Sequence, residues 1–212
     1  RAANVRFTGT HTVYDCYCEG ELLGEVKLKL LGNHNVLNSL SVIAVARELQ
    51  ISFGAIQSGL AEFKGVGRRI ELVGEAKGVT VIDDYGHHPT EIRATLSALK
   101  SLNRRIVTVF QPHRFTRTQL LWEDFGKAFS DTDFLVLAGI YPAGEAPIEG
   151  VSAQLIADVY DKHSDSKCLV VPNFEDIPAS VAKMLLPGDV VLTLGAGDIY
   201  KAGTKIIECL KQ

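Results

Sequence analysis

Five short apolar runs, rich in β-branched residues and separated by helical segments, constrain the fold of this chain more than any other feature. The intervals between them fit a crossover helix with its two loops, which is the connection that joins parallel strands. Runs as continuously apolar as these are typical of strands buried on both faces. They predict an α/β fold with a mostly parallel, doubly wound sheet and right-handed crossovers. The runs span residues 79–82, 106–110, 134–137, 169–171 and 190–194.

The first part of the chain has a different pattern. The first thirty residues show strand-like alternation, clearest at residues 26–30, and predict two or three antiparallel strands. After Gly32, apolar residues spaced three and four apart predict an amphipathic helix. Ser52 then has the position of an N-cap for a second helix.

A glycine-containing segment separates the two patterns. Residues 64–69 include Gly65 and Gly67 and fit neither the helix before them nor the strands after them. We place a domain boundary here, between residues 1–66 and residues 67–212. Because the flanking regions are patterned so differently, we also expect the two parts to move as units about this segment.

The composition is that of an ordinary soluble globular protein, with 46% hydrophobic and 22% charged residues. The 25 acidic residues nearly balance the 22 lysines and arginines, so neither nucleic acid nor an anionic membrane is an expected partner. No apolar run reaches the roughly 18 to 20 residues that span a bilayer, and the N-terminus lacks the apolar core of a signal peptide. We therefore expect a cytoplasmic protein, and the absence of an initial Met suggests that the chain belongs to a longer one.

Two polar clusters follow the first two strand-like runs, where each strand is expected to end. They are residues 83–89 (DDYGHHP) and 111–118 (QPHRFTRT). Ligands of open α/β sheets bind beyond the carboxyl ends of the strands, where carboxylates can accept from ribose hydroxyls and His or Arg can pair with phosphate or carboxylate oxygens. Helix capping would explain one acid or one threonine, but not two clusters in register. These residues therefore predict a ligand site.

Two other strand ends are open to more than one interpretation. The loop at residues 138–145 is a plain connector or part of the site, with about equal weight. Gly195 and Gly197 follow the last run and could cradle a phosphate, but a single G-x-G is a weak signal. A tight turn with Asp198 as the cap of the next helix is favoured.

An asparagine pair opens the first predicted helix. Asn35 and Asn38 lie three residues apart, on one side of its first turn, where amide groups can offer a donor and an acceptor to an adenine edge. Simple capping of the helix by Asn33 or Asn35 competes equally with this interpretation.

Taken together, four motifs resemble those of the ATP-dependent Mur ligases of peptidoglycan synthesis, in the correct order and over essentially the whole chain. The resemblance implies an enzyme of three domains: an N-terminal domain that binds a UDP-sugar, a central ATPase domain and a Rossmann-like C-terminal domain. Residues 1–66 would then be the last part of the central domain, and residues 67–212 the complete C-terminal domain. The motifs are residues 32–38, 67–71, 83–92 and 111–118.

The phosphate loop expected of the central domain is missing. The only Gly-Lys pair is Gly126-Lys127, which Ala128 follows in place of Ser or Thr. The magnesium ligands that the family places after that loop are also absent, so no metal ligand is expected in this chain. The resemblance thus indicates part of an enzyme, without its N-terminal domain and the rest of its central domain, that is inactive alone.

The resemblance implies a reaction as well. The parent enzyme would use ATP and Mg²⁺ to phosphorylate the lactyl carboxylate of UDP-N-acetylmuramate, and the amine of L-alanine would attack the acyl phosphate. Such chemistry depends on positioning and charge neutralisation. Two alternatives remain: a sister ligase that attaches a preformed peptide to the same nucleotide sugar, and a nucleotide-binding or dinucleotide-dependent module. The loop at 111–117 favours L-alanine over a peptide, and the dinucleotide fingerprint is incomplete.

The family's pattern assigns roles to individual residues. In the first part, Asn35 and Asn38 would face adenine, and His34 belongs to the same nucleotide-binding motif. At the strand ends, the nucleotide would be contacted at its ribose by Asp84, at its phosphates by Arg69 and His87, and near the reaction centre by Tyr85. The carboxylate and the developing oxyanion at the amino-acid end would be held by His113, Arg114 and Arg117. The groups expected to act in catalysis are Arg69, His87, His113 and Arg114.

Overall fold

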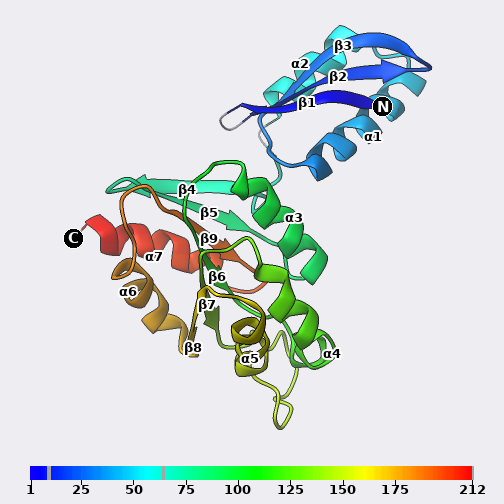
Figure 1. The fold of residues 1–212 in the computed structure, drawn as a ribbon. Helices are drawn as coiled ribbons and strands as arrows, with labels where there is room; N and C mark the ends of the chain where they lie inside the picture. The colour runs from blue at the N-terminus through cyan, green and yellow to red at the C-terminus, as the bar shows by residue number, and fades with distance from the viewer. Residues whose placement is uncertain (9–10, 64, 212) are drawn as a thin grey trace. The chain divides into compact units, whose positions relative to one another are not determined.

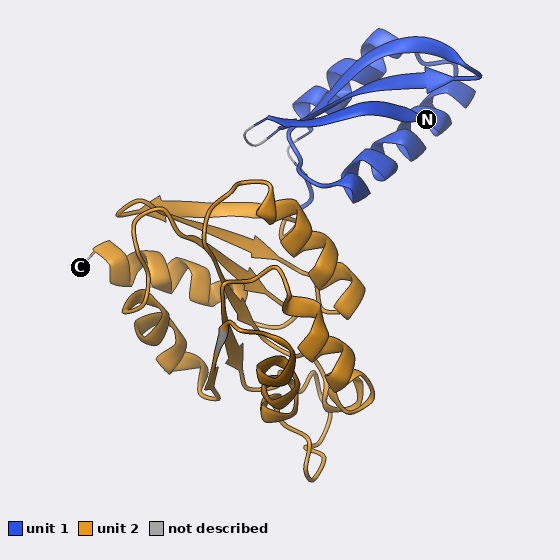
Figure 2. Cartoon of the chain, in the orientation of Figure 1, with its two compact units in different colours: residues 1–66 blue, residues 67–212 orange. Residues whose placement is uncertain are grey.

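A computed structural model describes residues 1–8, 11–63 and 65–211 of the chain. The chain forms two compact units, residues 1–66 and residues 67–212 (Figure 2). Lys64, in the predicted boundary segment, lies outside the described residues. Each unit has its own sheet and its own core, so each is described by itself.

The first unit is a three-stranded antiparallel sheet packed against two helices. The strands β1 (Ala2–Thr8), β2 (His11–Cys18) and β3 (Glu21–Leu28) follow one another in the sheet, which confirms the predicted antiparallel strands. The helices are α1 (Asn33–Glu48) and α2 (Phe53–Glu62). Alternate residues of β2 are buried against these helices, as expected of a sheet with one covered face. The core consists of Tyr14, Cys16, Val26, Leu28, Val36, Ile43, Ile56 and Leu60.

The second helix begins as its sequence predicts. The Ser52 side chain accepts a hydrogen bond from the backbone N–H of Ala55 at 3.4 Å, so Ser52 is its N-cap. The first helix differs, because its N-cap is Gly32, with a φ of 99° and no capping side chain. Capping by Asn33 or Asn35, one of the two interpretations of that motif, is therefore wrong: the conformation of Gly32, which favours glycine, starts the helix instead.

The second unit contains a six-stranded sheet in the order β4-β5-β9-β6-β7-β8 (Figure 1). The five strands predicted from the apolar runs are all present and pair in parallel, which confirms the α/β fold class. An unpredicted strand, β4, pairs antiparallel with β5 at one edge. The strands are β4 (Glu71–Ala76), β5 (Val79–Asp84), β6 (Ile106–Phe110), β7 (Phe134–Ala138), β8 (Lys167–Val171) and β9 (Val190–Leu194).

Helices cover both faces of this sheet, as a doubly wound fold requires (Figure 1). On one face, α3 (Pro89–Lys100), α4 (Phe115–Gly126) and α5 (Ala153–His163) enclose a core that includes the paired rings of Phe110 and Phe129. On the other face, α6 (Ile177–Ala182) and α7 (Tyr200–Lys211) cover a core rich in valine. Short 3₁₀ turns at Lys127–Phe129 and Phe174–Asp176 complete the unit.

Gly126 ends α4 where this helix packs against α5. A Cβ at this position would overlap the Val159 side chain and lie 3.1 Å from the carbonyl oxygen of Ile156. We therefore expect Gly126→Ala to lower the free energy of unfolding by about 1 to 3 kcal/mol, the usual cost of overpacking. Urea unfolding followed by circular dichroism measures this loss.

Gly59 of α2 provides the matched control. A Cβ there meets nothing within 4 Å, so Gly59→Ala should leave stability unchanged or raise it by about 0.5 to 1 kcal/mol. Equal unfolding curves for the Gly126→Ala variant and the unsubstituted chain would mean that the two helices can separate at no cost.

Two further findings concern membrane-spanning helices and the state of the cysteines. Within the described residues, no helix is both long enough and apolar enough to cross a membrane. All four cysteines, including the Cys16 and Cys18 pair on β2, are free thiols.

Candidate functional site

The carboxyl ends of β5, β9 and β6 lie side by side, because these strands are neighbours in the sheet. Backbone hydrogen bonds join the loops that follow them: the N–H of Gly195 donates to the carbonyl of Asp84 at 3.1 Å, and the loop after β6 bonds to the last residue of β9 at 3.0 Å. The rings of His87 and His113, one from each polar cluster, lie 6.0 Å apart. The fold therefore gathers both clusters around the turn at Gly195.

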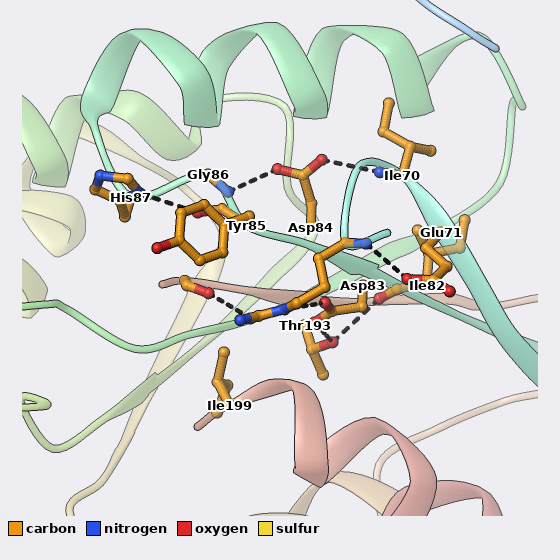
Figure 3. A network of polar contacts seen from close by, with 12 residues as sticks. Ile70, Glu71, Ile82, Asp83, Asp84, Tyr85, Gly86, His87, Thr193 and Ile199 are labelled. Carbon is orange, nitrogen blue, oxygen red and sulfur yellow. Dashed lines mark hydrogen bonds and ion pairs between the residues drawn. The ribbon is translucent and has the colours of Figure 1, made fainter. Parts of the chain in front are cut away.

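Asp84 is bonded within the protein at the end of β5. One carboxylate oxygen accepts from the backbone N–H of Gly86 at 2.8 Å, and the other from the N–H of Ile70 at 2.9 Å (Figure 3). The first oxygen also accepts from the Thr95 hydroxyl at 3.2 Å. The residue is 2% exposed, and this burial raises the pKa of its carboxyl. Asp84 therefore holds the surrounding loops together, and the ribose contact stays a prediction.

Asp83, one residue earlier, forms an ion pair with Arg68. The Nε of Arg68 donates to Asp83 at 2.8 Å, and the other oxygen of that carboxylate accepts from the Thr193 hydroxyl at 2.6 Å (Figure 3). The same guanidinium donates to the carbonyl of Gly195 at 2.6 Å. Sequence reasoning missed Arg68; the signal available was a second arginine beside Arg69 in a chain with paired carboxylates.

Tyr85 and His87, both in the first polar cluster (residues 83–89), contact each other. The Nδ1 atom of His87 lies 3.0 Å from the carbonyl of Tyr85, and the two rings meet edge to face at 5.2 Å (Figure 3). The guanidinium of Arg69 lies 5.8 Å from the centre of the Tyr85 ring. These three predicted residues are therefore neighbours. His88, which had no assigned role, is the N-cap of α3 and, with Glu91, forms a capping box.

His113 and Arg117 carry polar atoms that are buried without a partner. Among the described residues, nothing hydrogen-bonds to Nδ1 of His113 or to one terminal nitrogen of Arg117, and both atoms are shielded from solvent. The His113 ring stacks on Tyr141 at 5.4 Å, with 10° between the planes. Burial lowers the pKa of His113, and the nearby charges of Arg117 and His87 lower it further. Buried polar atoms without partners are rare and suit a ligand that supplies the missing bonds.

Arg114 points to a carboxylate of this chain. It is the N-cap residue of α4, with a φ of 75°, and its guanidinium lies 3.4 Å from Glu145 in an ion pair. Glu145 also accepts from the N–H of Thr116 at 3.0 Å and from its hydroxyl at 2.7 Å. The loop after β7 therefore belongs to the site, through Tyr141 and Glu145. An acidic residue in a Gly/Pro loop was too weak a signal to single out Glu145 in advance.

Packing explains both glycines of the turn after β9. A Cβ on Gly195 would lie 2.7 Å from the carbonyl oxygen of Gln111, and one on Gly197 would lie 2.7 Å from the Tyr141 ring. The side chain of Gln111 also accepts from the N–H of Ile199 at 3.2 Å. These contacts fit the tight-turn interpretation. The cap expected of Asp198 is not borne out, because α7 begins at Tyr200, two residues after Asp198, and the Asp198 side chain lies 3.1 Å from Lys201 in an ion pair.

The asparagine motif lies in the first unit. Asn35 donates to the carbonyl of Leu31 at 2.9 Å and contacts Asn38 at 3.5 Å, so the two amides do share one side of the first turn. Asn38 is exposed, and His34 is partly buried. The adenine contact stays a prediction.

The pKa of His113 provides a test of this local charge arrangement. We expect its NMR titration midpoint to lie below 6.5 and to rise in the Arg117→Ala variant, which removes a neighbouring positive charge. Because the unfolded chain binds this proton more readily, the free energy of unfolding should fall as the pH drops below 6.5. Arg104→Ala, at the amino ends of the strands, is the control. An unchanged midpoint in Arg117→Ala would place this guanidinium away from the ring.

The chain's second unit is a doubly wound α/β domain with arginines and histidines gathered at the carboxyl ends of its strands, the edge at which such folds usually place their ligands. More particularly, the chain belongs to the Mur ligase family: the family's sequence profile, described as "Mur ligase, glutamate ligase domain", matches residues 68–197.

Curated relatives and solved structures similar to this chain are also Mur ligases. The chain is 49% identical to UDP-N-acetylmuramate--L-alanine ligase of Geobacter sp. (strain M21) and 50% identical to that of Geobacter sulfurreducens, each over 100% of this chain and 46% of the relative. A solved UDP-N-acetylmuramate-alanine ligase from Thermotoga maritima matches with a TM-score of 0.83 and 28% identity, over 99% of this chain and 45% of that one. A murein peptide ligase from Psychrobacter arcticus shares the fold, with a TM-score of 0.65 and 22% identity over 99% of this chain and 43% of that one. The chain thus spans about half the length of the curated relatives it matches.

Proposed function

We propose that the protein containing this chain is an ATP-dependent ligase that adds L-alanine to UDP-N-acetylmuramate in peptidoglycan synthesis, through an acyl phosphate. The observation that carries this proposal is the identity of about half the residues, along the whole chain, with relatives named for that reaction. The cationic cluster at the strand ends supports it, because ATP and UDP-N-acetylmuramate are anions and L-alanine carries a carboxylate. We place the reaction in the cytoplasm, where ATP is available.

The family's pattern gives the nucleotide contacts that we propose. Asn35 and Asn38 would face adenine, next to His34, while Arg69 and His87 would contact the phosphates beside the Tyr85 ring. ATP supplies the phosphoryl group that activates the muramyl carboxylate. The guanidinium of Arg69 and the neighbouring Tyr85 ring present a cation and a flat surface together, which suits a nucleotide.

Two buried atoms without partners support an amino-acid carboxylate site. A terminal nitrogen of Arg117 is an obligate donor, and Nδ1 of His113 donates in one tautomer. A carboxylate at this point would satisfy both, and burial would strengthen the interaction because solvent competes less. Arg114 would be available once its ion pair with Glu145 opens. Held in this way, the amine of L-alanine would be oriented for attack, with Arg114 and His113 stabilising the oxyanion.

The described residues also bear on where Mg²⁺ could bind. Among them, no group of three His, Cys, Asp or Glu side chains could hold a metal ion. The two carboxylates nearest the cluster, Asp83 and Asp84, are committed to bonds within the protein. That this chain supplies no Mg²⁺ ligand stays a prediction.

The choice of amine tests the proposal against its nearest alternative. A murein peptide ligase has the same fold, so the fold does not distinguish a ligase for L-alanine from one for a preformed peptide. The full-length enzyme should show kcat/KM for L-alanine at least about 100-fold above that for a tripeptide, because unpaired groups in a buried polar site reject the wrong substrate strongly. Equal or inverted values would favour the peptide ligase.

A further inference from the structure

Arg68 is the second residue of the C-terminal unit, and the proposed chemistry leaves it unassigned. Its backbone has a φ of 60°, and that of Ile70 has a φ of 50°. This tight path is held at both sides: the N–H of Arg68 donates to Glu71 at 2.6 Å, and its carbonyl accepts from the N–H of Tyr85 at 2.7 Å. Arg69, between the two strained residues, has its backbone direction set by these contacts.

The Arg68 side chain joins two neighbouring strands. It donates through Nε to Asp83, at the end of β5, and through a terminal nitrogen to the carbonyl of Gly195, just after β9. The Asp83 side chain is only 4% exposed, and the Thr193 hydroxyl holds its second oxygen in place (Figure 3). Two of the three side-chain nitrogens of Arg68 are therefore directed into the protein, away from any ligand.

Aromatic contacts extend this arrangement to the predicted nucleotide residues. The guanidinium of Arg68 lies 4.6 Å from the centre of the Tyr200 ring and 5.1 Å from that of the Tyr85 ring. Arg69 contacts the same Tyr85 ring at 5.8 Å. A change at Arg68 would thus reach Arg69 through both the backbone and a shared ring.

We propose that Arg68 is a positioning residue of the ligase: it fixes residues 67–70 to the ends of β5 and β9, and so directs Arg69 and Tyr85 toward the nucleotide. The inference rests on the proposed function, in which Arg69 and Tyr85 contact ATP. A lysine cannot replace Arg68, because one ammonium cannot reproduce the fixed fork that reaches a carboxylate and a carbonyl together.

A double-mutant cycle in the full-length enzyme tests this. Arg68→Ala should raise the KM for ATP about 10- to 100-fold, the scale on which a displaced binding group affects a reaction, and leave the KM for L-alanine within about twofold. Because Arg68 acts mainly through Arg69, and only the part that acts through Tyr85 remains once Arg69 is gone, the double variant Arg68→Ala/Arg69→Ala should be no more than about threefold worse than Arg69→Ala alone. Arg68→Lys should recover little of the loss.

Two further variants distinguish a loss of positioning from misfolding. Asp83→Asn keeps the shape of the side chain but weakens the ion pair, so it should raise the KM for ATP in the same direction. Arg104→Ala removes an arginine of similar bonding, to Thr80 and the carbonyl of Gly188 at the opposite end of the strands. It should lower the melting temperature but leave the KM for ATP unchanged.

The outcomes separate the inference from the function on which it rests. An unchanged KM for ATP in Arg68→Ala, or independent losses that multiply in the double variant, would overturn the positioning role. An equal rise in Arg104→Ala would overturn it too, since the effect would then be general destabilisation. If Arg69→Ala itself has a normal KM for ATP, the nucleotide assignment in the proposed function fails instead.

Discussion

Replacing Arg117 by alanine in the full-length enzyme should lower kcat/KM for L-alanine by about 10- to 150-fold and leave the KM for ATP nearly unchanged. A charge-assisted bond to a carboxylate contributes on the order of 1.5 to 3 kcal/mol, which corresponds to that range. Arg117 has a buried nitrogen without a partner among the described residues, and this nitrogen could donate a hydrogen bond to a bound carboxylate. Lysine should rescue poorly, because a point charge lacks the guanidinium fork.

Arg93, an exposed arginine of α3, is the matched control for this experiment. Arg93→Ala should have wild-type kinetics for both substrates. Arg114→Ala should have an effect in the same direction as Arg117→Ala. The effect should be smaller, because Arg114 must give up its ion pair with Glu145 before it can bind the substrate carboxylate. Normal kcat and KM for L-alanine in both variants would make these two arginines structural.

The 212-residue chain alone should neither form the amide bond nor bind ATP more tightly than about millimolar. Its sequence has no Gly-Lys-Ser/Thr phosphate loop, and the charges of a triphosphate need backbone N–H groups, a lysine and a metal ion together. Stacking and a few neutral hydrogen bonds at about 1 kcal/mol each would remain. A dissociation constant near millimolar corresponds to about 4 kcal/mol.

Calorimetry with ATP and Mg²⁺, beside a phosphate-release assay with UDP-N-acetylmuramate and L-alanine, measures both expectations. Micromolar binding, or turnover that depends on both substrates, would reveal a phosphate site in this chain. The turn at Gly195 would be examined first. Ala196→Pro would remove a backbone N–H there, whereas an alanine at Gly195 or Gly197 would disturb packing against Gln111 and Tyr141.

The fold could be predicted where burial dictates the sequence pattern. Strands covered on both faces must be apolar throughout, so the five parallel strands were visible as runs. The edge strand β4 was not: it is half exposed, its sequence is ELVGEA, and its pairing is irregular between Leu72 and Gly74. An exposed edge with an irregular register has neither a continuous run nor clean alternation.

The location of the candidate site and the types of its residues could be predicted from the sequence, but the contacts of each residue could not. Two adjacent carboxylates, Asp83 and Asp84, look alike in sequence. Their partners decide what they do, and Thr193 reaches Asp83 from 110 positions away in the chain. The role of Glu145 likewise depends on a loop folding back onto Thr116, 29 positions earlier. Contacts at such separation leave no local pattern.

The most direct measurement of the central claim is phosphate release by the full-length protein, with each substrate omitted in turn. We expect release only when ATP, UDP-N-acetylmuramate and L-alanine are all present, together with one ADP and one new amide bond for each phosphate. His113→Ala should reduce this release, and Arg104→Ala should not. Release that does not require L-alanine, or a redox reaction with a nicotinamide cofactor in its place, would contradict the assignment of these strand ends to an amide-forming ligase.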